Sequence, residues 1–97
     1  MSETYKSVWD ALENDPIIRD NLKVRSHLLD EISAAIENTG ETQRKIAEQL
    51  NITQPRVSAL MKGKINKFSV DNLMAIAYKL GLDVSIKVSE HQDEIAA

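Results

Sequence analysis

The chain has 97 residues, of which 42% are hydrophobic and 28% are charged, a composition typical of one small globular domain. It contains no cysteine, which excludes disulfides and thiolate metal sites, and no apolar run approaches the roughly 20 residues that cross a bilayer. Because the first residues show no basic flank followed by an apolar run, we expect no signal peptide. The lack of a long apolar run predicts no membrane association, and the lack of cysteine favours a cytoplasmic location.

The net charge of −3 is unevenly distributed along the chain. Residues 42–68 contain six cations against the single anion Glu48, so this segment carries +5 and the rest of the chain carries −8. The six cations are Arg44, Lys45, Arg56, Lys62, Lys64 and Lys67. Exposed charges are largely screened beyond about 10 Å, so the local field governs attraction to phosphate. We interpret the basic segment as a DNA-facing surface; clustering by chance is the alternative.

The first part of the chain is predicted to hold two helices. Residues 1–20 are expected to form an N-terminal extension with one short helix around Trp9, which Asn14-Asp15-Pro16 ends. From Leu22 to Asn38 the apolar residues recur at helical spacing. Gly40 follows this second helix and can adopt the positive φ that often ends a helix.

Residues 21–82 are predicted to form the main domain, in which three more helices follow. Each begins at a Thr or Ser that can accept a hydrogen bond from the free backbone N–H groups of the first turn. These helices are predicted from Thr42 to Leu50, from Thr53 to about Lys62, and from Ser69 to Leu80. The predicted fold class is therefore mainly all-α, a compact domain of four to five helices.

Residues 83–88 alternate between apolar and polar side chains, which predicts a half-buried strand. Val84, Ile86 and Val88 share one face. One strand needs a partner for its backbone groups, and either the N-terminal residues or the same strand of a second molecule could supply it. We expect a homodimer in which these three residues form the dimerisation surface, and a flexible acidic tail at residues 89–97.

Residues 42–63 have the pattern of a helix-turn-helix, in which two short helices are joined by a turn of three or four residues. Ala47 is small where the two helices would pack closely, and Asn51 stands where the turn often requires positive φ. Val57 and Leu60 lie three residues apart and are expected to face the first helix of the pair. A plain helical bundle is the alternative interpretation of this pattern.

The other face of the second helix of the motif has the chemistry needed to contact bases. Glutamine can pair with adenine, arginine with guanine and serine with either kind of edge, so Gln54, Arg56 and Ser58 are the predicted base-reading residues. Pro55 and Ala59 offer no polar group. The predicted phosphate-binding residues flank this face and are Gln43, Arg44, Lys62, Lys64, Asn66 and Lys67.

The sequence resembles the Cro and phage repressor, or XRE, family of DNA-binding proteins. The resemblance rests on Thr42-Gln43, Ile46-Ala47, Thr53-Gln54 and Gly63. A narrower similarity, to HigA-like antitoxins of bacterial toxin–antitoxin loci, rests on residues 8–12, 53–58, 63–64, 68–69 and 81–84. The resemblance implies a lambda-repressor-like helix-turn-helix domain. Asn51 replaces the usual glycine, and Pro55 reduces the number of side chains available for base reading.

These observations together predict a sequence-specific repressor that binds double-stranded DNA at a palindromic operator. The resemblance implies an autoregulating antitoxin whose partner would be a basic toxin protein. Two alternatives stay open: a stand-alone XRE-type regulator without a toxin, and a protein that chiefly masks a toxin. His27, His91 and the adjacent carboxylate pairs form no catalytic or metal-binding arrangement, so we expect neither an enzyme nor a cofactor nor a metal site.

Overall fold

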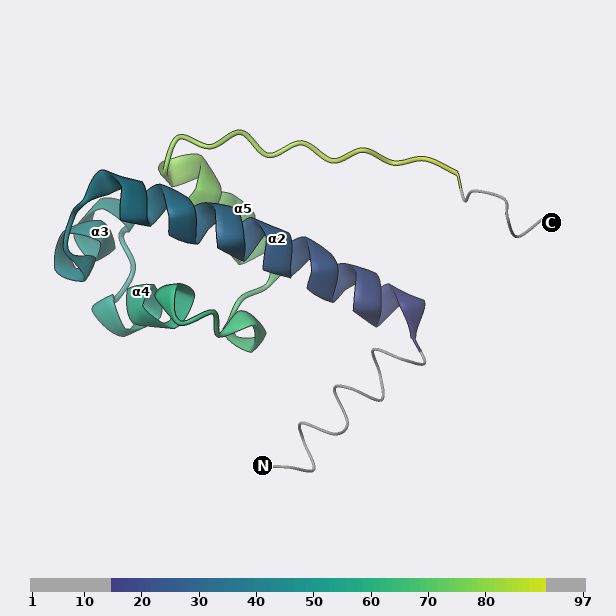
Figure 1. Cartoon of the computed structure of the whole chain (residues 1–97), viewed down its shortest axis with the longest axis horizontal. Helices are drawn as coiled ribbons and strands as arrows, with labels where there is room; N and C mark the ends of the chain where they lie inside the picture. The colour runs from purple at the N-terminus through teal and green to yellow at the C-terminus, as the bar shows by residue number, and fades with distance from the viewer. Residues whose placement is uncertain (1–14, 91–97) are drawn as a thin grey trace, which may run out of the picture.

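The computed structural model describes residues 15–90, which form four α-helices and one short 3-10 helix. The helices are α2 (Pro16–Thr39), α3 (Gln43–Leu50), α4 (Gln54–Met61), η1 (Ile65–Lys67) and α5 (Val70–Lys79). Helices α3, α4 and α5 gather around α2, whose first turns extend beyond them (Figure 1). The short helix predicted around Trp9 and the tail beyond residue 90 lie outside the described residues.

The long helix α2 begins at Pro16, six residues before the predicted start at Leu22. Asp15 is its N-cap, and its carboxylate accepts hydrogen bonds from the backbone N–H groups of Ile17 (2.9 Å) and Ile18 (3.4 Å). Proline is well suited to the first helical position, because the N–H that it lacks would have no partner within the helix. Asp15 and Pro16 therefore start a helix here, and the predicted end of the preceding short helix lies outside the described residues.

The core consists of apolar side chains from all four α-helices and from the segment after α4. The buried set is Leu28, Leu29, Ile32, Ile36, Ile46, Ala47, Leu50, Val57, Ala59, Leu60, Phe68, Leu73, Ile76 and Ala77. Most were predicted from helical spacing, but Phe68 lies outside any helix and is only 2% exposed. Its burial fixes the position of the loop between α4 and α5.

The turn between α3 and α4 contains three residues, 51–53, as the sequence predicts. Asn51 has φ 57° and ψ 46°, the left-handed conformation expected of it, and its N–H donates to the carbonyl of Glu48 (3.3 Å). The hydroxyl of Thr53 accepts from the N–H of Arg56 and so caps α4. This close connection holds α3 and α4 in the helix-turn-helix arrangement.

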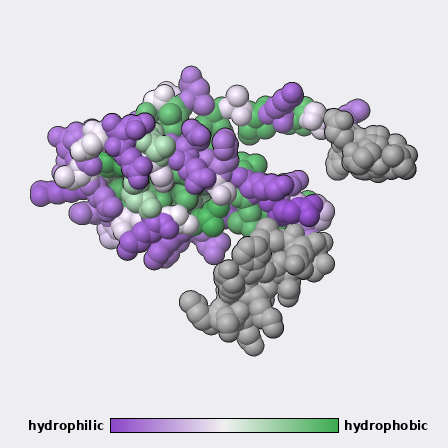
Figure 2. Space-filling model, in the orientation of Figure 1, coloured by the Kyte–Doolittle hydropathy of each residue, from purple (hydrophilic) through white to green (hydrophobic). Residues whose placement is uncertain are grey.

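Residues 82–90 have no regular secondary structure and leave the end of α5 as an extended segment (Figure 1). Leu82 and Val84 pack partly buried against the core, whereas Ile86 and Val88 are 69% and 88% exposed. Figure 2 shows apolar surface along this segment. The strand predicted at residues 83–88 is unconfirmed, since the described part of one chain places no second strand beside it. None of the helices within residues 15–90 is long and apolar enough to span a membrane.

Candidate nucleic-acid interface

Helix α4 has one buried face and one exposed face. Val57 and Leu60 are fully buried against the core. Gln54 and Pro55 are exposed at the start of the helix, and Ser58 is half-buried one turn later. The side chain of Gln54 makes no hydrogen bond to any residue in the range 15–90. Its amide is therefore free to pair with a ligand at the N-terminal end of α4.

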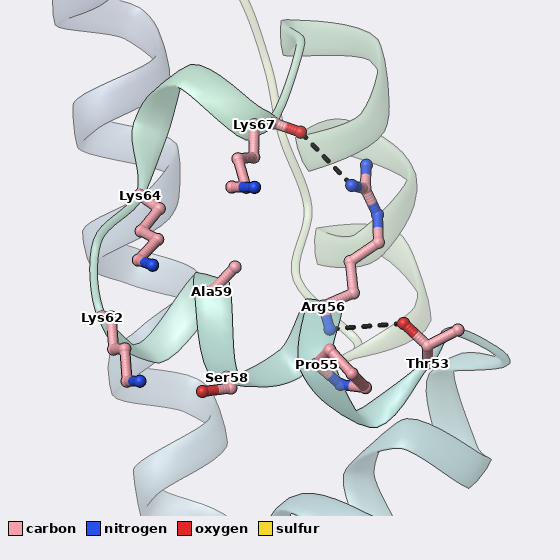
Figure 3. Close-up of a pocket in the computed structure, with 8 residues that line it drawn as sticks. All are labelled: Thr53, Pro55, Arg56, Ser58, Ala59, Lys62, Lys64 and Lys67. Carbon is pink, nitrogen blue, oxygen red and sulfur yellow. Dashed lines mark hydrogen bonds between the residues drawn. The ribbon is translucent and has the colours of Figure 1, made fainter. Parts of the chain in front are cut away.

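The exposed face of α4 and the loop after it line an open hollow of about 440 Å³ (Figure 3). Its lining residues are Thr53, Pro55, Arg56, Ser58, Ala59, Lys62, Lys64 and Lys67. Every ionisable side chain in this set is a cation, and the three lysines are exposed. The hollow is therefore suited to a polyanion, because no carboxylate in its lining offsets the positive charge.

The basic loop, which we define as residues 62–68, has a well-bonded backbone. Gly63 adopts φ 72° after the last turn of α4, and the N–H of Lys64 donates to the carbonyl of Ala59 (3.0 Å). Within the loop, the N–H of Lys67 donates to the carbonyl of Lys64 (3.0 Å), and that of Phe68 donates to the carbonyl of Ile65 (3.2 Å). The lysine side chains thus extend from an ordered turn.

Arg56, predicted to read a base, makes three contacts within the chain. Its Nη1 donates to the carbonyl of Lys67 (3.3 Å, dashed in Figure 3) and its Nη2 to Oδ1 of Asn72 (3.3 Å). Its guanidinium carbon lies 4.5 Å from the centroid of the Phe68 ring, a cation–π distance. Arg56 therefore links α4 to the basic loop and to the first turn of α5.

Arg25, which was not among the predicted site residues, contacts the same loop from α2. Its Nε donates to Oδ1 of Asn21 (2.8 Å), and its Nη1 lies 3.2 Å from the carbonyl oxygen of Ile65 and 3.3 Å from that of Phe68. The sequence contains one signal of this role. Arg25 lies three residues after Leu22 and four before Leu29, which places it within the apolar stripe of its helix, on the side that faces the other helices.

The other predicted phosphate-binding residues do not line the hollow. Gln43 and Arg44 are exposed at the start of α3, and Nε of Arg44 lies 4.0 Å from a carboxylate oxygen of Glu48. Asn66 is exposed on the basic loop but lines a separate depression between α2 and the start of α5. The structure thus brings Arg56, Ser58, Lys62, Lys64 and Lys67 together, and places the remaining predicted residues around them.

Within residues 15–90 no polar or charged side chain is buried, and no three His, Asp or Glu side chains are grouped so that they could hold a metal ion. The chemistry of this surface is therefore that of exposed hydrogen-bonding groups and cations arranged on a buried apolar scaffold.

The fold and this surface define a helix-turn-helix protein. A comparison with protein families matches residues 15–89 to a helix-turn-helix domain family. Among solved structures, the chain is similar to a protein provisionally named XRE family transcriptional regulator, with a TM-score of 0.71 and 32% sequence identity over 79% of this chain and 86% of that one. The chain therefore belongs to the XRE family of helix-turn-helix proteins. The comparison with curated proteins finds no match.

Proposed function

We propose that the protein is a sequence-specific DNA-binding transcriptional regulator that inserts α4 into the major groove. The observation that carries this proposal is the hollow beside α4, which is lined by four cations and no carboxylate. Helices in this arrangement place their first residues closest to the base edges. The similar solved protein is also named as a transcriptional regulator, which supports the same function for this chain.

In this proposal the surface divides into base-reading and phosphate-binding residues. Gln54 and Ser58, on the exposed side of α4, contact base edges by hydrogen bonds. Lys62, Lys64 and Lys67 neutralise phosphates on one side of the groove, where the amide of Asn66 donates a hydrogen bond to a phosphate oxygen. Gln43 and Arg44, at the start of α3, contact the backbone on the other side.

Binding to DNA from the region upstream of the gene tests this function. We expect fluorescence anisotropy to show tight binding to one short upstream duplex and weaker binding to a scrambled duplex of the same composition. Footprinting would then locate the operator, which we expect to be an inverted repeat. Gln54→Ala should reduce the preference for this duplex, and Gln49→Ala, at an exposed glutamine on α3, is the matched control. Absence of duplex binding even in dilute salt would refute the proposal.

We further propose that the regulator acts as a two-fold homodimer through residues 83–88. Val84, Ile86 and Val88 alternate with polar residues, and the last two are largely exposed in the single chain. Pairing of this segment with its copy would supply partners for its backbone and cover its apolar face. A two-fold dimer would then match a palindromic operator whose half-sites are about 34 Å apart.

A more specific role, as the autoregulating antitoxin of a type II toxin–antitoxin pair, fits two features. The chain outside residues 42–68 carries −8, which would attract a basic protein. Ile17, on the part of α2 that extends beyond the other helices, is 79% exposed. Co-expression with a short basic open reading frame beside the gene tests this role. Co-purification of the two products supports it, and DNA binding without any such partner favours a stand-alone regulator.

If the chain instead acts chiefly as a toxin-masking inhibitor, its two activities should separate. A variant that lacks Lys62, Lys64 and Lys67 would then still neutralise the toxin in growth assays, although it no longer binds DNA. Loss of neutralisation together with loss of DNA binding would argue against this alternative.

A further inference from the structure

Three backbone carbonyls of the basic loop accept hydrogen bonds from two arginines on different helices. Arg25 on α2 donates to the carbonyls of Ile65 and Phe68, and Arg56 on α4 donates to that of Lys67. The carbonyl of Ile65 also accepts from the N–H of Phe68, whereas those of Lys67 and Phe68 have no backbone donor within residues 15–90 and need partners from side chains. The two guanidinium groups supply these partners and approach the loop from α2 and from α4.

The contacts of Arg56 conflict with a role in reading bases. Bidentate pairing with guanine requires the guanidinium to point into the groove, whereas that of Arg56 points to Lys67 and Asn72 and lies over Phe68. Extending it into a groove would break both hydrogen bonds and the cation–π contact. The side chain of Gln54, two residues nearer to the start of α4, makes no hydrogen bond within residues 15–90 and can pair without such a loss.

We propose that Arg25 and Arg56 are positioning residues that clamp the basic loop to α2 and α4 and so set the placement of Lys64 and Lys67 relative to the base-reading face. This inference rests on the proposed DNA-binding function and assigns Arg56 a different role from the one predicted from the sequence. The clamp holds the loop at a fixed distance from α4. Lys64 and Lys67 can therefore bind phosphates of the same duplex whose bases α4 reads.

A double-mutant cycle separates positioning from direct contact. We expect Arg25→Gln to weaken DNA binding about tenfold, within the range of coupling measured between contacting residues. In a background that already carries Lys64→Ala and Lys67→Ala, the same substitution should have an effect of less than about twofold. An equal loss in both backgrounds would overturn the proposal, since Arg25 would then act independently of the loop lysines.

Charge-preserving variants provide a second criterion. Arg25→Lys should bind DNA as weakly as Arg25→Gln, because an ammonium group cannot reproduce the planar fork that reaches Asn21, Ile65 and Phe68 together. Arg19→Gln, which removes an exposed arginine from the same helix, is the control and should change affinity little. Full affinity in Arg25→Lys would overturn the clamp and indicate a phosphate contact.

The DNA affinity of Arg56→Lys on the preferred and the scrambled duplex distinguishes a positioning role of Arg56 from base reading. A positioning residue should lose affinity by the same factor on the preferred and the scrambled duplex. A loss confined to the preferred duplex, with relaxed selection at one base pair, would restore Arg56 as a base-reading residue and overturn its place in the clamp.

Amide hydrogen exchange tests the clamp without DNA. The amides of Lys67 and Phe68, bonded to carbonyls inside the loop, should exchange several-fold faster in Arg25→Lys, whereas amides of the α2 core such as Ile36 should keep their protection. Unchanged exchange in the loop would overturn the proposal. If the wild-type chain bound no DNA, the proposed function would fail, while this exchange measurement would still decide whether the clamp exists.

Discussion

The side-chain ammonium of Lys79, at the end of α5, donates a 2.9 Å hydrogen bond to the backbone carbonyl of Leu50, the last residue of α3. This carbonyl belongs to the last turn of a helix, where no intrahelical N–H is available. The cation also lies at the negative end of the helix dipole. One lysine thus attaches the end of α3, the first helix of the helix-turn-helix, to the end of α5.

Replacing Lys79 by methionine should therefore lower the free energy of unfolding by about 1 kcal/mol, because the carbonyl of Leu50 loses a charged donor. For a domain of this size such a change lowers Tm by about 4–8 °C. Urea or thermal denaturation measures the effect. Lys23→Met, at an exposed lysine on α2, is the matched control, and equal stability of the two variants would contradict the assigned role.

The left-handed conformation of Asn51 leads to a second prediction about stability. Asn51→Ala should destabilise the protein by about 1 kcal/mol, because alanine cannot adopt positive φ without a steric cost. Asn51→Gly should leave the unfolding free energy within about 0.5 kcal/mol of the wild type. Denaturation curves of the two variants test this. If alanine were tolerated as well as glycine, the turn would not depend on the conformation at this residue.

The local features of the fold were predictable because short-range rules determine them. Thr42, Thr53 and Ser69 were each identified as N-caps from the helical pattern that follows them, and each accepts the expected backbone hydrogen bond. The positive φ of Asn51 was expected for the same reason. In contrast, the start of α2 at Pro16 was not predicted, although the aspartate before this proline is a suitable N-cap.

The long-range features of the surface were not predictable from spacing. Phe68 follows a run of basic and polar residues, and its burial depends on how the loop folds back against the helices. Once Phe68 is buried, its ring and the nearby carbonyls attract Arg56, which the pattern alone assigned to base reading. Arg25 takes its role from contacts with residues 40 and 43 positions away in the sequence.

Base reading by Gln54 makes a prediction about specificity. Gln54→Ala should weaken binding to the preferred duplex by about 1–3 kcal/mol and relax selection at one base pair, while binding to random DNA changes little. Competition assays with single-base variants of the operator measure this. Gln49→Ala should leave both affinities unchanged. An equal loss on every duplex would show that Gln54 contacts the phosphate backbone and reads no base.

The lysines of the basic loop should affect salt dependence without affecting sequence preference. Lys64→Ala and Lys67→Ala should each reduce the slope of log K against log salt concentration by about 0.9, the value for one released counterion. Titrations at several salt concentrations on preferred and scrambled duplexes measure these slopes. Lys23→Ala, on α2, is the control for loss of one charge, and the loop assignment would be wrong if it changed the slope as much.

The exposed apolar residues of the C-terminal segment lead to a prediction about assembly. Ile86→Asp and Val88→Asp should each shift the protein from dimer to monomer, because a carboxylate on the paired face would be buried without a partner. Sedimentation velocity at micromolar concentration measures the oligomeric state. Ser85→Asp, on the alternate face of the same segment, should stay dimeric. We also expect the two monomeric variants to bind a single half-site about as well as the wild type does. They should lose the tighter binding to the full palindrome, because the substitutions remove only the linkage between two α4 helices. A monomeric wild type, or an unchanged dimer in both variants, would place the contact between protomers elsewhere.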